Sequence, residues 1–238
     1  MRSALAFLTP VGRARTPDPG TLAWFPVVGA VIGAVLGVLW WGMGHVWPVG
    51  VDAALVVAAD LGLTGMLHMD GLLDSADGLF LHGGPERRLA VMRRSDVGAF
   101  GAAVGGSVLL LRWVTLVAIV PSPVLLGSIW AVSRGAMAVA AGCVPYAREE
   151  GLASAFVGGP EARRPAVVAG LLGGGIGLAG LLWWQPIGGA ATLLAEAAAA
   201  SGVVAFGWKR VGGFTGDLLG AAAVVAETIA LLVAAARW

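Results

Sequence analysis

The chain has 238 residues, of which 58% are hydrophobic and only 12% are charged, so too few polar side chains are present to cover a soluble globular domain. Its 15 basic and 14 acidic residues give a formal net charge of +1, which excludes the basic excess of a general nucleic-acid-binding protein. One cysteine and three scattered histidines exclude a disulfide framework and the usual zinc-binding spacings.

Seven apolar stretches follow one another along the chain, each near the roughly 20 residues that a helix needs to cross a bilayer. The segment 4–8 is too short to span and is expected at the membrane interface. Gly33 and Gly37, four residues apart, favour close helix packing. The sequence predicts a single all-α domain over 1–238, a polytopic membrane bundle of about seven transmembrane helices. The expected spans are 22–41, 51–69, 98–120, 124–144, 167–184, 188–206 and 218–236.

Basic residues are concentrated in alternate connections between these stretches. Twelve of the fifteen lie in the N-terminal segment or in the connections 70–97, 145–166 and 207–217, whereas the opposite connections are short and nearly uncharged. Cytoplasmic loops of membrane proteins carry the excess of Arg and Lys. We therefore expect a multi-pass protein of the plasma (inner) membrane, with its N-terminus and these connections in the cytoplasm.

The segment 65–80, GMLHMDGLLDSADGLF, carries three aspartates at the end of the second expected span. Asp74 and Asp77 follow Asp70 by four and seven residues, so a helix would present all three on one narrow face. Ionised carboxylates that lie so close repel one another unless their pKa values rise or a cation neutralises them. A hard divalent ion such as Mg²⁺ is the natural partner, and a solvated acidic helix face is the alternative.

Five other ionisable residues are candidates for the same site. Asp217, at the start of the last span, is expected to meet the three aspartates. Arg134 and Arg148 have the fork of donors that suits phosphate oxygens, although Arg148 also fits an ordinary cytoplasmic loop. Glu227, deep in the last span, either contacts substrate or pairs with an internal arginine. His68 either contacts substrate or metal, or hydrogen-bonds locally.

Acidic metal ligands beside arginines at one membrane face suit a diphosphate-containing substrate, because the metal offsets phosphate charge and the guanidinium groups hold the oxygens. The residues alone therefore indicate phosphoryl-type transfer at the cytoplasmic interface.

Several short motifs occur in one order along nearly the whole chain, at 6–9 (AFLT), 25–29 (FPVVG), 68–78 (HMDGLLDSADG), 92–101, 133–135 (SRG), 146–152 and 215–221 (TGDLLGA). Together they resemble the cobalamin synthase family, also called adenosylcobinamide-GDP ribazoletransferases. The resemblance implies the last assembly step of adenosylcobalamin, in which α-ribazole or its 5′-phosphate attacks adenosylcobinamide-GDP and GMP leaves. It implies magnesium as the cofactor. We expect the ion on Asp70, Asp74 and Asp77, together with Asp217, and we expect one of these catalytic aspartates to take the proton of the ribazole hydroxyl.

Two alternatives remain open at this point. A CDP-alcohol phosphotransferase also uses paired aspartate motifs in a membrane bundle, but the Ala-Arg of its signature is absent after Asp74. A cation or small-molecule transporter would use Asp60, Glu196 and Glu227 as sites within the membrane. Neither alternative involves nucleic acid, and the sequence is compatible with a homo-oligomer.

Overall fold

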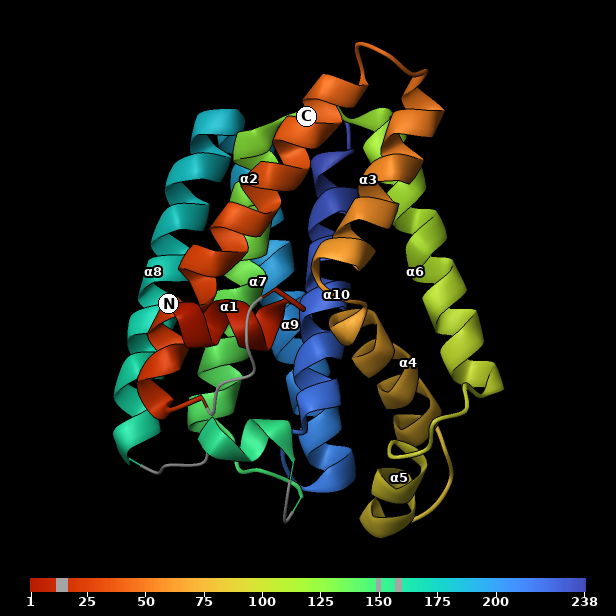
Figure 1. Ribbon diagram of the computed structural model, residues 1–238, viewed down its shortest axis with the longest axis vertical. Helices are drawn as coiled ribbons and strands as arrows, with labels where there is room; N and C mark the ends of the chain where they lie inside the picture. Colours follow the sequence, from red (N-terminus) through yellow and green to blue (C-terminus); the bar gives the residue numbers. More distant parts are fainter. Residues whose placement is uncertain (12–16, 149–150, 157–159) are drawn as a thin grey trace.

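The computed structural model describes residues 1–11, 17–148, 151–156 and 160–238. Over these residues the protein is helical, and its only β-type pairing is an isolated bridge between Tyr146 and Phe214. Figure 1 shows an upright bundle in which α7 and α10 lie at the centre, with the other long helices around them. The predicted all-α architecture is confirmed.

The helices follow the apolar stretches of the sequence. In chain order they are α1 (Arg2–Leu8), η1 (Pro19–Trp24), α2 (Phe25–Met43), α3 (Val49–Leu63), α4 (Leu67–Leu79), α5 (Pro85–Val91), α6 (Ala99–Ala118), α7 (Pro123–Cys143), η2 (Leu152–Phe156), α8 (Pro160–Trp184), α9 (Pro186–Val211) and α10 (Gly216–Ala234).

Six helical segments are long and apolar enough to cross a membrane: η1 with α2, and then α6, α7, α8, α9 and α10. The second expected span, 51–69, is not one continuous helix. It divides into α3 and α4, which meet at an angle of 89° and together form a seventh candidate span. Gly65 (φ 58°) and Met66 (φ 59°) adopt the left-handed conformation that ends α3. The three aspartates therefore lie on a helix with its own direction.

Glycines let α2 lie directly against α7. A Cβ atom placed on Gly33 would overlap the carbonyl oxygen of Leu126, and one on Gly29 or Gly37 would overlap the α7 backbone in the same way. This confirms the close packing expected from Gly33 and Gly37. The long faces of α8 and α9 are mainly exposed, as expected for helices that contact lipid.

Replacing Gly33 by Ala should destabilise the protein by about 1 to 3 kcal/mol, because the added methyl group overpacks the α2–α7 contact. Thermal unfolding in detergent micelles measures the change. Gly42→Ala is the matched control, because a Cβ at Gly42 on the same helix meets no atom within 4 Å. Equal melting temperatures for the two variants would contradict the packing described here.

Candidate active site

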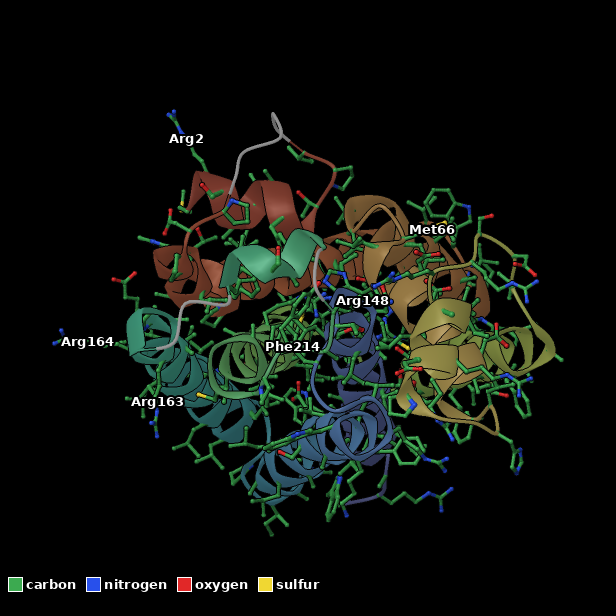
Figure 2. All side chains as sticks on the ribbon, turned by 90° about the horizontal axis from the view of Figure 1, so that it is seen from below. Arg2, Met66, Arg148, Arg163, Arg164 and Phe214 are labelled. Carbon is green, nitrogen blue, oxygen red and sulfur yellow. The ribbon has the colours of Figure 1, made fainter. Side chains whose placement is uncertain are left out.

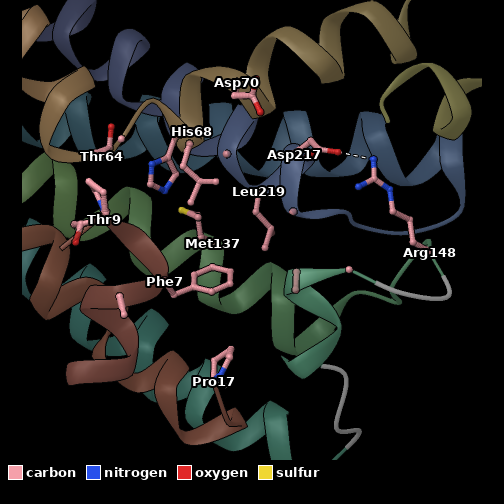
Figure 3. A pocket seen from close by; sticks show the side chains of 18 of the residues that line it. Phe7, Thr9, Pro17, Thr64, His68, Asp70, Met137, Arg148, Asp217 and Leu219 are labelled. Atoms are coloured by element: carbon pink, nitrogen blue, oxygen red, sulfur yellow. Dashed lines mark hydrogen bonds and ion pairs between the residues drawn. The ribbon is translucent and has the colours of Figure 1, made fainter. Parts of the chain in front are cut away.

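A cavity of about 510 Å³ lies between the N-terminal segment, α4, α7, α10 and the segment that follows α7. Figure 3 shows it with Asp217 and Arg148 at one end and His68, Thr9 and Thr64 at the other. The carboxylates among its lining residues are Asp70 and Asp217. The cavity thus combines charged groups that are almost 150 residues apart in the sequence.

The close crossing of α4 and α10 brings these groups together. A Cβ atom on Gly71 would come within 2.7 Å of the carbonyl oxygen of Asp217. Three residues further along α10, a Cβ on Gly220 would lie 3.1 Å from the Cα atom of His68. Because these glycines have no side chain, α4 and α10 touch, and Asp70 lies beside Asp217 while the backbone of His68 lies beside Gly220.

The segment after α7 adds a positive charge to the carboxylates. The Phe214 amide donates to the Pro145 carbonyl (2.8 Å) and the Ala147 amide donates to the Phe214 carbonyl (2.9 Å), which fixes this segment beside the start of α10. Arg148 then donates through Nη2 to the Asp217 carboxylate, with a nitrogen-to-oxygen distance of 2.5 Å. The predicted phosphate-binding arginine therefore lies in the cavity wall with a carboxylate partner.

Tyr146 supplies a neutral hydroxyl to the same wall. Burial raises the pKa of the Tyr146 phenol above its ordinary value of 10.0, against a smaller opposing effect of Arg148. The phenol therefore keeps its proton at neutral pH and can donate a hydrogen bond to an anionic ligand. This residue was not among the predicted site residues, although it is the first in the motif 146–152.

The other two aspartates of α4 differ from Asp70. Asp74 is half-buried, and Asp70, Asp77 and Asp217 lie close enough to add to the repulsion on its negative charge. Asp77 accepts hydrogen bonds from the backbone amides of Gly98 (2.7 Å) and Gly101 (2.9 Å), so both of its oxygens cap the start of α6. The metal-ligand role of Asp77 stays a prediction, and the structure gives this residue a capping role.

A buried ion network lies deeper in the bundle. Arg112 of α6 donates to Asp60 of α3 and to Glu227 of α10, both at 2.6 Å. Arg134 of α7 also pairs with Glu227, and Ser133 donates to the same carboxylate at 2.8 Å. Charges in a low-dielectric interior need such partners.

The network changes the interpretation of Glu227 and Arg134. Of the two roles that the sequence left open for Glu227, the structure shows the ion pairing, and Glu227 pairs with both internal arginines, Arg112 and Arg134. The side chains of Glu227 and Arg134 are each only 1% exposed, so substrate could reach them only if the bundle opened. Their substrate-binding roles stay predictions. Asp60 and Glu227, considered for the transporter alternative, have structural partners.

His68 does not form the local hydrogen bond considered as its alternative role. It is 3% exposed, and neither ring nitrogen has a hydrogen-bond partner among the described residues. It lines the main cavity and also a small second cavity beside Arg112, Arg134 and Glu227. Its substrate-binding role stays a prediction, and its place in the wall is consistent with that role.

The apolar part of the cavity wall was missed by the sequence analysis. Phe7, Pro10 and Pro17 come from the N-terminal segment, and Met137 comes from α7. The one signal for Phe7 was its place in the motif 6–9.

Arg13, Arg15, Glu149 and Glu150 lie outside the described residues.

Comparison with known proteins shows the family of the chain. The family model described as "Cobalamin-5-phosphate synthase" matches residues 1–235. The chain belongs to this family. A curated adenosylcobinamide-GDP ribazoletransferase of Chlorobaculum parvum is 36% identical over 239 residues, which cover 98% of this chain and 92% of the relative. One of Deinococcus radiodurans is 39% identical, covering 96% of this chain and 82% of the relative. No solved structure matches the chain significantly.

Replacing Glu227 by Gln should lower the stability of this cobalamin-5-phosphate synthase family member by about 3 to 5 kcal/mol, because two buried arginines lose their shared counter-charge. Unfolding in detergent measures the effect, and Glu86→Gln on the exposed face of α5 is the control. A stable Glu227→Gln protein with a raised KM for substrate would indicate substrate contact instead.

Replacing Asp77 by Asn should cost about 1 to 3 kcal/mol of stability, because the single amide oxygen of asparagine can accept from only one of the two α6 amides, and should reduce turnover much less than the same change at Asp70. Turnover and unfolding are measured on both variants. If Asp77→Asn lost as much turnover as Asp70→Asn without unfolding, Asp77 would act as a ligand and not only as a cap.

Proposed function

We propose that this protein joins adenosylcobinamide-GDP to α-ribazole, or to its 5′-phosphate, with release of GMP. Family membership and the names of the relatives support this activity. The structural observation that carries the proposal is the meeting of Asp70, Asp217 and Arg148 in the wall of one cavity. Such a combination suits a diphosphate, whose transfer depends mainly on positioning and charge stabilisation.

The proposed reaction is a phosphoryl-type transfer. A ribose hydroxyl oxygen of the ribazole, other than the 5′ oxygen that carries the phosphate in ribazole 5′-phosphate, forms a bond to the phosphorus nearest the cobinamide, and the bond from that phosphorus to the oxygen of the departing GMP breaks. The hydroxyl proton passes to a cavity base, for which Asp70 and Asp217 are the candidates lining the wall. With the ribazole phosphate as acceptor, the product keeps that phosphate.

Arg148 is the group that we assign to the phosphate oxygens. Its guanidinium offers planar pairs of donors, and its Nε has no partner among the described residues. Its ion pair with Asp217 orients the side chain toward the cavity before substrate arrives. A bound diphosphate would share or replace this partner and would be held beside the carboxylates.

We propose that one or two of the carboxylates of Asp70, Asp74 and Asp217 would hold Mg²⁺ in this protein. Within the described residues no group of three or more acidic, His or Cys side chains is arranged as a complete metal site. Magnesium commonly takes only one or two carboxylates together with water and substrate phosphates, so the facing carboxylates of α4 and α10 fit it. When bound, the ion would neutralise negative charge on the diphosphate and on the leaving group.

We infer that the charged end of the cavity opens toward the cytoplasm. The connections rich in basic residues, including α5 and the start of α8, lie at the lower end of the bundle in Figure 1. Arg148, Arg163 and Arg164 are seen in the view from below (Figure 2). Basic connections stay on the cytoplasmic side during insertion, which also supports the plasma (inner) membrane as the location.

Replacing Asp70 or Asp217 by Asn should lower turnover by about 100-fold or more, because each change removes a negative oxygen at the place where the diphosphate and its cation would bind. The assay follows GMP and corrinoid product formed by purified protein with both substrates and Mg²⁺. Asp96→Asn is the control, since Asp96 is exposed and pairs with Arg94.

Two results would contradict the proposal. Wild-type protein that releases no GMP from the two substrates would rule out the reaction. If Asp70→Asn and Asp217→Asn turned over as fast as Asp96→Asn, neither carboxylate would take part in the reaction. If activity persisted after the protein was passed over a chelator and assayed without added divalent ions, only the proposed role of Mg²⁺ would be contradicted.

A further inference from the structure

The two ends of the cavity differ in chemistry. Asp217 and Arg148 form the charged end, whereas Phe7, Pro17 and Met137 give the rest of the wall an apolar surface (Figure 3). In this view His68 and Phe7 lie at the end away from Arg148. A ligand that fills the whole cavity must therefore have one anionic part and one apolar part.

His68 is the polar group at the apolar end whose hydrogen-bonding capacity is unused. The hydroxyl of Thr9 donates to the Leu5 carbonyl and that of Thr64 donates to the Asp60 carbonyl, both at 2.7 Å. In contrast, both ring nitrogens of His68 are buried without a partner among the described residues. Buried polar atoms rarely lack a hydrogen-bond partner, so the partner of His68 is expected to be a ligand that enters the cavity.

The position of His68 is fixed by its surroundings. It lies in the first turn of α4, two residues after the left-handed residue Met66. On the other side its backbone touches α10 at Gly220. The imidazole is therefore presented by a rigid backbone, which suits selective recognition of a ligand atom.

Phe7 offers an aromatic surface at the same end. Its ring stacks on Phe25 with a centroid distance of 5.6 Å and meets Phe156 edge-on at 4.9 Å. Three elements, α1, α2 and η2, thus hold the ring in place. A flat aromatic group of a ligand can pack against such a ring with little loss of side-chain freedom.

We propose that the apolar end of the cavity, with His68 and Phe7, binds the aromatic base of the acceptor nucleoside, and that His68 hydrogen-bonds the acceptor. This inference rests on the proposed function. The other base in the reaction is guanine, which carries several donors and acceptors on its edges. An apolar wall with one imidazole leaves most of those atoms unpaired, whereas it matches a benzimidazole-type base with a single free ring nitrogen.

The size of the cavity agrees with this assignment. Its volume of about 510 Å³ falls within the range of small-molecule sites. A nucleoside at the apolar end leaves the charged end for the diphosphate, with the acceptor hydroxyl between the two. The corrin ring of the donor is then outside the cavity.

The test compares His68→Leu, His68→Gln and wild-type protein in two measurements. The first is steady-state kinetics with each substrate varied in turn. The second is titration of α-ribazole into protein without the second substrate. We expect His68→Leu to raise the KM for ribazole and its dissociation constant about tenfold or more, with the KM for adenosylcobinamide-GDP changed less than about twofold. His68→Gln should recover part of the loss, because an amide also donates and accepts.

His82→Ala is the matched control, since His82 is an exposed histidine outside the cavity and should leave both constants unchanged. If His68→Leu does not fold, Phe7→Leu takes its place and should raise the same two constants. The inference would be overturned if only the KM for adenosylcobinamide-GDP rose, or if neither the KM nor the dissociation constant for ribazole changed. If the wild-type protein still released GMP, the proposed reaction would nevertheless stand. If the wild-type protein formed no product but bound ribazole, and His68→Leu weakened that binding, the proposed reaction would be overturned and the ribazole-binding site would stand.

Discussion

The close packing of α4 on α10 determines where the charged groups of the cavity meet. Gly71 and Gly220 let the two helices touch at backbone level, and this contact sets Asp70 beside Asp217. A larger residue at either glycine would separate the carboxylates before any chemistry was affected. The bend after α3 has the same importance, because it turns α4 by 89° toward α10. The site therefore depends on backbone geometry first and on side-chain charge second.

The buried ion network gives this arrangement a rigid support. Arg112 connects Asp60 on α3 with Glu227 on α10, and Arg134 adds α7 to the same cluster. Helices in a membrane gain little from apolar contact with one another, so polar contacts and close packing specify their arrangement. His68 lines the small cavity beside this network as well as the main cavity. The network thus holds the helices that form the inner wall of the proposed reaction site.

The sequence was sufficient to predict the fold class and most of the spans, because long apolar runs have few alternatives in a bilayer. It could not show the break at Gly65 and Met66, since both residues also occur in an apolar helix and Gly65 lies against Pro10 of the distant N-terminal segment. The spacing of the aspartates predicted that they share one helix face. It could not show that Asp77 caps α6, because the backbone amides that donate hydrogen bonds to Asp77 are 21 and 24 residues away in the sequence. Only the tertiary structure distinguishes a capping carboxylate from one that faces a cavity.

The most direct measurement of the central claim is a crosslink between α4 and α10 at the cavity. Cysteines replace Asp70 and Asp217 in a protein in which Cys143, the single native cysteine, is changed to Ser. A short thiol-specific crosslinker should join the two positions within one chain, as judged by mass spectrometry after proteolysis. Failure to crosslink, although each single-cysteine protein reacts with a maleimide, would show that the two carboxylates do not share a cavity and would contradict the account.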